Sequence, residues 1–422
     1  MRGDALARPV RHPGDLRWET RLLAVVTATL VAFGIAATYS AASLITHNGQ
    51  ASGVNFAINQ TIGALLGGVG LIVASRIDYY RWRQFAWPLL GITVACLMVP
   101  LLPFAHRISP LVHGARRWID IGPLNFQPSE IARVTLVIWC AMIATKKGEQ
   151  LRELKKGLLP CVIGLGTVFV LIAAEPNLSM AVLVALLAAT VLFTAGAKIG
   201  HFMLLGLVAV LVVWHKITHT GFRSERLGVF LNGGSTSDAA WQINQSLIGF
   251  GSGRLIGVGF GHGQQKMYLP FAYSDFLFST IGEEWGFVGV CLVVLLFALF
   301  IWLGFRIAKT AADPFGQYLA VGLTCAIGLT AFMHMAVTIK LMPTTGLTLP
   351  FMSYGRSSLV ISMVGTGILI NIGRLRGKPR SAEERRASGA MPRPSGAERR
   401  VSDRRSSRGE RRGTEPPGDF GE

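Results

Sequence analysis

Long apolar runs constrain this chain more than any other feature of its sequence. Leu158–Ala174 and Phe202–Trp214, for example, contain no charged residue. Over the whole chain, 51% of the 422 residues are hydrophobic and 15% are charged, and the mean hydropathy is +0.45. A soluble domain usually carries about 25% charged residues. The sequence therefore excludes a disordered chain, argues against a soluble enzyme, and predicts an integral membrane protein.

A helix needs about 20 apolar residues to cross the hydrocarbon core. By this criterion we predict an all-α polytopic bundle of about ten transmembrane helices. The first apolar run is too long for the core of a signal peptide and is interpreted as the first span. The predicted spans are Leu22–Ile45, Phe56–Ser75, Phe85–Leu102, Pro128–Ala144, Leu158–Ala174, Leu178–Ala195, Ile199–Ile217, Phe276–Phe305, Phe315–Ile339 and Ser353–Ile372.

The basic residues predict how the bundle is oriented. With the N-terminus in the cytoplasm, the short cytoplasmic connections are rich in Lys and Arg, as the positive-inside rule requires. Both termini are then cytoplasmic. The predicted organisation is a cytoplasmic segment 1–21, a membrane domain 22–373 with a long, glycine-rich extracytoplasmic loop 216–275 before the eighth helix, and a disordered basic cytoplasmic tail 374–422.

The formal net charge of +18 is not explained by orientation alone. Eleven basic residues fall on the outward side, where they form either a solvated loop surface or a site for an anion. Three of them sit at helix ends or within spans, where a cation without a partner or water is costly. The eleven are Arg107, Arg116, Arg117, Arg133, Lys216, Arg223, Arg226, Arg254, Lys266, Lys340 and Arg356.

Two acidic positions are candidates for chemistry. Asp275 stands among aromatic residues where the long loop meets the eighth span. A desolvated carboxylate there suits a general base, and a helix N-cap is the alternative. Glu130 and Arg133 share one helix face at i, i+3 spacing, so they form either a local ion pair or part of a substrate cavity. The nine histidines form no spaced metal cluster, and no metal site is predicted.

Five motifs in order then resemble the SEDS family, the FtsW/RodA/SpoVE group, over about 22–373. They are GARRWIDIGPLNFQPSEIAR, EPNLSMA, INQSLIGFGSGRLIGVGFGHGQQKMYLP, SDFLFSTIGEEWGFVG and MPTTGLTLPFMSYGRSS. Three features, GARRWI, the QK-x-YLP stretch and the basic tail, are more similar to the division branch, FtsW, than to the elongation branch.

The resemblance implies a peptidoglycan glycosyltransferase that polymerises lipid II at the outer face of the cytoplasmic membrane, at the division septum. It implies Asp275 as the catalytic base. It also implies partners, namely a class B penicillin-binding protein and other division proteins, and no nucleic acid. A divalent cation, Mg²⁺ or Mn²⁺, would suit the pyrophosphate leaving group, but the sequence shows no ligand cage for one. The expected substrate-binding residues are Glu130, Arg133, Arg116, Arg117, Lys266, Arg254, Ser353 and Arg356.

This sequence departs from the family pattern at several places. Arg133 replaces a lysine, Asn177 an acidic residue, His334 an asparagine, and Lys340 and Arg356 replace glycines. These changes predict a more cationic site than is usual. Two other functions remain open at this point: a lipid II flippase or transporter, and a non-catalytic division scaffold.

Overall fold

The computed structural model describes residues 18–43, 46–47, 50–51, 53–102, 105–111, 115–121, 124–153, 157–218, 221–232 and 238–375. The chain divides into two units, Met1–Arg376 and Gly377–Glu422. The second unit lies outside the described residues, and so does most of the predicted disordered tail.

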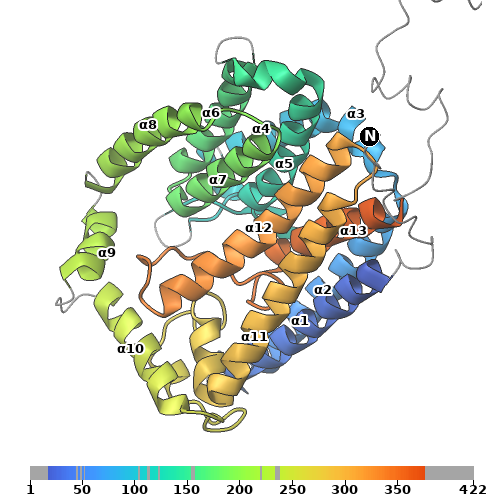
Figure 1. Cartoon of the computed structure of the whole chain (residues 1–422). Coiled ribbons are helices and arrows are strands. Elements are labelled where there is room, and N and C mark those ends of the chain that lie inside the picture. Colours follow the sequence, from blue (N-terminus) through green and yellow to red (C-terminus); the bar gives the residue numbers. More distant parts are fainter. Residues whose placement is uncertain are drawn as a thin grey trace, which may run out of the picture. The chain divides into compact units, whose positions relative to one another are not determined.

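Helices make up most of the described part of the chain (Figure 1). The α-helices are α1 (Trp18–Ala42), α2 (Gly53–Arg76), α3 (Tyr79–Gln84), α4 (Ala86–Met98), α5 (Pro128–Lys147), α6 (Leu159–Ala174), α7 (Leu178–Thr194), α8 (Ile199–Thr218), α9 (Gly221–Asn232), α10 (Asp238–Gly253), α11 (Leu277–Lys309), α12 (Pro314–Thr338) and α13 (Arg356–Arg374). The short 3₁₀ helices are η1 (Val99–Leu101), η2 (Ala105–Arg107), η3 (Gly148–Arg152) and η5 (Gln265–Met267). Two antiparallel pairs join β1 (Thr46–His47) to β2 (Gln50–Ala51) and β3 (Ile119–Ile121) to β4 (Leu124–Phe126).

Each predicted span coincides with a helix, so the all-α membrane fold is confirmed. Among the described residues, six helices are long and apolar enough to cross a membrane: α1, α2, α5 extended by η3, α11, α12 and α13. The helices α4 (extended by η1), α6 and α7 are apolar but shorter. The number of ten crossings therefore stays a prediction. The last predicted span began too early, because α13 starts at Arg356 and Ser353 lies in the preceding loop.

Helix α5 lies at the centre of the bundle. It packs against α4, α7 and α12, and sixteen of its twenty residues are buried. Helix α13 packs along α2, and α11 packs against α1, α10 and α12. The N-termini of α5, α11 and α13 carry the motif residues, so this packing positions the candidate site.

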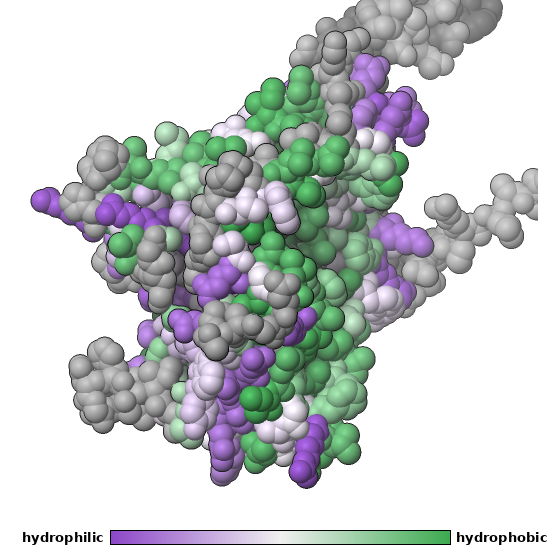
Figure 2. All heavy atoms as spheres, turned by 90° about the vertical axis from the view of Figure 1, so that its left-hand side faces the viewer, coloured by the Kyte–Doolittle hydropathy of each residue, from purple (hydrophilic) through white to green (hydrophobic). Residues whose placement is uncertain are grey.

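The outer helices expose apolar side chains, as a lipid-facing surface requires. Figure 2 looks onto the α8–α10 side and shows hydrophobic residues over broad areas, with hydrophilic residues in separate patches. Large apolar side chains are exposed on α8 at Met203, Val210 and Trp214. On α10, Trp241 and Ile248 are exposed in the same way. Exposed apolar surface of this extent marks contact with a membrane or a partner.

The predicted loop 216–275 contains more regular structure than its glycine content suggested. Helices α9 and α10 occupy much of it, and α10 packs against α11. Glycine allows this close crossing, because a Cβ at Gly253 would lie only 2.0 Å from the carbonyl oxygen of Gly282. The glycines in this part of the segment thus serve helix packing as well as turns.

Candidate active site

Five segments that are distant in the sequence line one cavity of about 450 Å³. They are the stretch 117–127 with the start of α5, the start of α7, the turn before α11, the middle of α12, and the loop that leads into α13 with the first residues of that helix. Four of the predicted site residues line this cavity: Asp275, Glu130, Arg117 and Arg356. The other lining residues include Asn177, Tyr273, Tyr354, Thr330 and Ser357.

Asp275 ends the turn that precedes α11. Its backbone N–H donates to the carbonyl oxygen of Phe271 at 3.0 Å, which fixes the turn. The N-cap residue of α11 is Phe276, so the structure does not support the alternative interpretation of Asp275 as the cap. A Cβ added at Gly346 would lie 3.6 Å from Asp275 Oδ2, so the carboxylate stands against the backbone of the loop before α13.

Ser353 holds the turn of Asp275 against this loop and does not line the cavity. Its hydroxyl donates to the carbonyl oxygen of Ser274 at 2.7 Å and accepts from the Leu349 N–H at 3.0 Å. The backbone N–H of Tyr354 donates to the Tyr273 carbonyl oxygen at 3.0 Å. Ser353 is thus a positioning residue, and its predicted direct contact with substrate gains no support from this geometry.

An aromatic wall borders the carboxylate. Tyr273 and Tyr354 pack edge to face with ring centroids 5.7 Å apart, and both rings contact Phe56 of α2. Burial raises the pKa of the Tyr273 hydroxyl, and the neighbouring Tyr354 and Asp275 raise it further. Tyr273 therefore stays neutral and can donate a hydrogen bond near Asp275.

Glu130 and Arg133 form the predicted ion pair in the first turns of α5, with 3.1 Å between Arg133 Nη2 and Glu130 Oε2. Glu130 also lines the cavity, so the ion pair and a place at the cavity are compatible, and contact with substrate stays a prediction. Arg133 lies deeper, with 1% of its surface exposed, and donates to Thr330 and Ser362. It acts as a buried partner that orients Glu130, and it does not itself line the cavity.

Arg117 and Asn177 meet the cavity at the turn between α6 and α7. Arg117 Nε donates to the Glu175 carbonyl oxygen at 3.1 Å, and its Nη2 donates to the Pro176 carbonyl oxygen at 2.7 Å. Asn177 caps the start of α7, and its side-chain N–H donates to Ser129 Oγ at 3.3 Å. The neutral amide of Asn177 therefore pairs with a neutral hydroxyl group on α5. The family pattern has an acidic residue at position 177 instead.

Glu175 is a fully buried acid beside this cavity. Neither of its carboxylate oxygens has a hydrogen-bond partner among the described residues. Burial raises the pKa of Glu175 to about 8, and the positive charge of Arg117 opposes the shift. The sequence offered no signal for this burial, because Glu175 stands at a helix end next to a proline.

Glu175→Gln is expected to remove a pH dependence of stability. In the unfolded chain this carboxyl group has the ordinary Glu pKa of about 4.3. Between that pH and about 8 the folded protein keeps the proton, so wild-type stability falls as pH rises, by up to about 1.4 kcal/mol per pH unit. The free energy of unfolding of both proteins is measured in mixed micelles from pH 5 to 8. The stability of the variant relative to wild type should increase as the pH rises. The exposed Glu153→Gln serves as control, and a constant difference across this range would contradict the assignment.

Arg226 of α9 was not among the site residues predicted from the sequence. Its Nη1 donates to the Thr344 carbonyl oxygen at 3.1 Å, in the loop that carries Gly346. Burial lowers the pKa of Arg226, the negative charge of Asp275 raises it, and the positive charge of Arg117 lowers it. Arg226 therefore lies within electrostatic range of Asp275 and Arg117, although it does not itself line the cavity.

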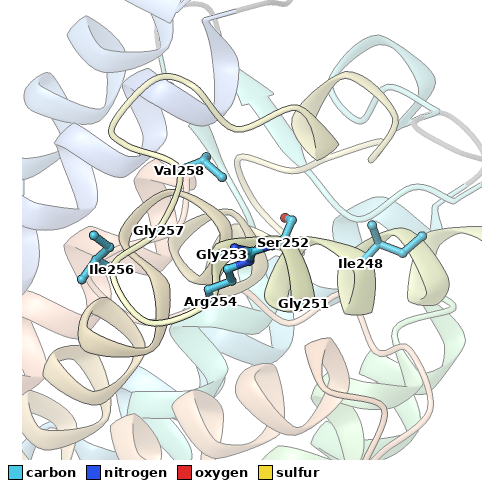
Figure 3. Close-up of a pocket in the computed structure, with 8 residues that line it drawn as sticks. All are labelled: Ile248, Gly251, Ser252, Gly253, Arg254, Ile256, Gly257 and Val258. Atoms are coloured by element: carbon cyan, nitrogen blue, oxygen red, sulfur yellow. The ribbon is translucent and has the colours of Figure 1, made fainter.

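The remaining predicted cations lie elsewhere. Lys266 is buried in an ion pair with Glu284, with 2.9 Å between Nζ and Oε1. Arg254 lines a separate open cavity beside the end of α10 (Figure 3). Arg116 is half-buried and does not line the cavity of Asp275. The expectation that these three cations surround one leaving group therefore gains no support from the structure.

Two further departures from the family pattern lie on α12 and directly after it. His334 is buried one turn after Thr330 on α12, and its Nδ1 lies 2.7 Å from the Leu347 carbonyl oxygen. Lys340 follows the end of α12 in a left-handed conformation, with φ of 61°. Within the described ranges, no three His, Cys, Asp or Glu side chains come together as metal ligands.

Comparison with known proteins assigns the chain to a family. The family model described as cell cycle protein, FtsW/RodA/SpoVE, matches residues 20–377. A protein of Trichlorobacter lovleyi named "Probable peptidoglycan glycosyltransferase FtsW" is 38% identical, over 86% of this chain and 95% of its own length. Stage V sporulation protein E of Bacillus subtilis is 32% identical, over 84% and 96%.

Solved structures agree in fold. One, described as "Structural coordination of polymerization and crosslinking by a peptidoglycan synthase complex", superposes with a TM-score of 0.70 and 26% identity, covering 85% of this chain and 98% of the other. The rod shape determining protein RodA of Thermus thermophilus superposes with a TM-score of 0.63 and 24% identity, over 85% and 97%. The chain therefore belongs to the FtsW/RodA/SpoVE family of multi-pass membrane proteins.

Proposed function

We propose that this protein is a peptidoglycan glycosyltransferase that polymerises lipid II during septal wall synthesis. One observation carries the proposal: a cavity in a member of this family places Asp275 and Glu130 together with the cations Arg117 and Arg356. A carboxylate suits removal of a proton from an attacking hydroxyl. Fixed cations suit a leaving group that gains negative charge as its bond breaks. The names of the relatives support the same activity.

The reaction uses these groups in one displacement. The 4-hydroxyl of the acceptor's terminal GlcNAc attacks the anomeric carbon of the donor MurNAc, and Asp275 takes the hydroxyl proton. The bond from the anomeric carbon to the pyrophosphate oxygen breaks, and its electron pair leaves with undecaprenyl pyrophosphate. Arg117 and Arg356 stabilise the charge that grows on this oxygen. Glu130, held by Arg133, hydrogen-bonds a sugar in the cavity.

The positions of charges along the helices support an outward-facing cavity. Lys146 and Lys147 occupy the last turn of α5, and Arg306 and Lys309 the last turn of α11. Glu130 and Asp275 stand at the opposite ends of the same two helices. With the basic ends in the cytoplasm, as the positive-inside rule requires, the cavity opens on the outer face of the membrane, where lipid II is polymerised.

A class B penicillin-binding protein is the proposed partner. The superposable chain comes from a complex whose description joins polymerisation to crosslinking, and a polymerase needs a transpeptidase to link its product. The direct test supplies labelled lipid II to the purified chain alone and together with such a partner. Formation of glycan polymer by the pair supports the function, and its absence contradicts it.

Arg226→Gln is expected to lower polymerisation by roughly 10²-fold, the usual effect of removing one preorganised charge contact from an active site. Arg226→Lys should keep part of the rate, because it keeps the charge and loses only the guanidinium geometry. The measurement is the initial rate of glycan synthesis by the reconstituted pair. Arg107→Gln, at an exposed arginine of η2, is the matched control. Equal rates for Arg226→Gln and the control would remove Arg226 from the site.

A further inference from the structure

Helix α11 is interrupted at Gly286, and a segment distant in the sequence supplies hydrogen-bond acceptors for the backbone groups left unpaired there. Gly286 has φ of 63°, so the helical hydrogen-bond ladder is interrupted there. The N–H groups of Phe287 and Val288 donate to the carbonyl oxygens of Arg254 and Leu255 at 2.9 and 3.1 Å. Unpaired backbone groups are very costly at membrane depth, and this pairing satisfies them. The segment that follows α10 thus takes part in the backbone hydrogen bonding of α11.

The sequence of α11 places this interruption at the membrane boundary. Phe287–Phe305 is an apolar run of 19 residues that ends directly before Arg306. At 1.5 Å per residue it is about 29 Å long, which matches a hydrocarbon core of about 30 Å. Gly286 therefore lies at one surface of the core. The turn that carries Asp275 precedes the start of α11 at Leu277, on the side of Gly286 away from the apolar run.

The side chains around the interruption suit that depth. Leu255 and Ile256 are 69% and 81% exposed, and they adjoin the exposed Phe287 and Val288 of the membrane span. Phe260 stacks on Tyr39 of α1 and packs edge to face with Trp285 of α11. Aromatic side chains of this kind gather where the hydrocarbon core meets the head groups. The lipid-facing surface of α11 thus continues onto the segment after α10.

An open cavity of about 670 Å³ lies beside this segment. Its lining includes Ile248 of α10, Ile256 and Val258, and also Gly251, where an added Cβ would meet nothing within 4 Å. Figure 3 shows Ile248 and Ile256 on either side of Arg254. Arg254 is exposed, and it forms no ion pair within the described ranges of the chain. The nearby acids Glu283 and Glu284 are already engaged, by the N–H groups of 264 and 265 and by Lys266.

We propose that Gly251–Phe260 is embedded at the membrane surface and binds a membrane glycerophospholipid. The phosphate pairs with the Arg254 guanidinium, whose planar donors match phosphate oxygens. One acyl chain lies along the open cavity between the apolar side chains of Ile248 and Ile256. This site is distinct from the cavity of Asp275, and it explains why Arg254 lies apart from the other predicted substrate-binding residues.

Photo-crosslinking tests the assignment directly. p-Benzoylphenylalanine replaces Ile256 in one full-length variant and Leu111, in a loop on the same side of the membrane and 65% exposed, in a matched control. Both are irradiated in phospholipid nanodiscs, and adduct masses are measured. We expect several-fold more phospholipid adduct at 256 than at 111. Equal yields would overturn the proposal, and so would a polyprenyl adduct at 256 from native membranes, because the open cavity would then serve the lipid carrier of the substrate.

The head group is tested at Arg254. Native mass spectrometry of the detergent-purified protein should show bound phospholipid on the wild type, less on Arg254→Lys, and none on Arg254→Gln. The order follows from charge first and planar geometry second. Retention of phospholipid by Arg254→Gln at the wild-type level would contradict the role of Arg254. The polymerisation assay is not needed for either result, so failure here leaves the proposed enzyme function untouched.

Discussion

Asp275→Asn is expected to reduce glycan synthesis by the purified pair by about 10²–10⁴-fold, the usual contribution of a general base. Asparagine keeps the size of the side chain and its place against Gly346 but cannot take the acceptor proton. The turn itself is held by the backbone bond from Asp275 to Phe271 and by the bond from Ser353 to Ser274, so the fold should persist. The measurement is polymer formed from labelled lipid II, with unfolding monitored in parallel.

Asp120→Asn is the matched control, because Asp120 is an exposed acid in the β3–β4 hairpin near the same cavity. The control should keep wild-type activity. Full activity in Asp275→Asn would contradict the proposed mechanism. If wild type makes no polymer but moves lipid II across vesicle membranes, the protein is a transporter. If Asp275→Asn still supports division in cells that lack the wild-type chain, a scaffold role accounts better for it.

The helices could be predicted from the sequence because the signal is local. An apolar run such as Leu158–Ala174 has few alternatives to a buried or membrane helix. The ends were harder to predict, because they depend on contacts. Ser353 reads as part of the last span, yet its hydroxyl bonds Ser274 and Leu349 and keeps it in the loop. Helix α10 was missed because glycines dominate its end, and these glycines permit its close packing on α11.

Much less of the candidate site could be predicted, because its residues meet only in three dimensions. The positions of the acidic residues and the motif resemblance both pointed to Asp275 and Glu130, and both residues line one cavity. It could not separate Arg117, which lines that cavity, from Lys266, which is buried elsewhere. The role of a cation depends on the acidic residue that pairs with it. Lys266 pairs with Glu284 through the tertiary fold, and their separation in the sequence does not predict this pairing. Arg226 was missed for the same reason, since its interaction with Asp275 crosses 49 positions of sequence.

Lys266 and Glu284 form a polar lock between three parts of the fold. Lys266 Nζ donates to Glu284 Oε1 of α11 at 2.9 Å, to Ser40 Oγ of α1 at 3.2 Å and to the Gly261 carbonyl oxygen at 2.8 Å. These three acceptors satisfy all three donors of the ammonium group. Glu284 also accepts from Ser40 at 2.6 Å. The lock fastens the segment after α10 to both α1 and α11.

Lys266→Met is therefore expected to lower the free energy of unfolding by about 3–5 kcal/mol, because it leaves the Glu284 carboxylate buried without its cation. Methionine fills most of the space of the lysine stem, so the loss reports the charge rather than packing. The measurement is steric trapping or SDS unfolding in mixed micelles. Lys309→Met, at an exposed lysine in the last turn of α11, is the control and should change stability by less than about 0.5 kcal/mol.

The double variant Lys266→Met with Glu284→Gln separates a lock from a substrate contact. If the pair is structural, removing both charges should restore much of the lost stability, since a buried pair replaced by neutral groups is often nearly neutral in free energy. Double-mutant coupling between the two positions then measures the interaction. If Lys266 instead contacts the pyrophosphate, Lys266→Met should slow polymerisation at unchanged stability, and adding Glu284→Gln should restore nothing. Wild-type stability in Lys266→Met would thus contradict the lock and return Lys266 to the set of substrate-binding candidates.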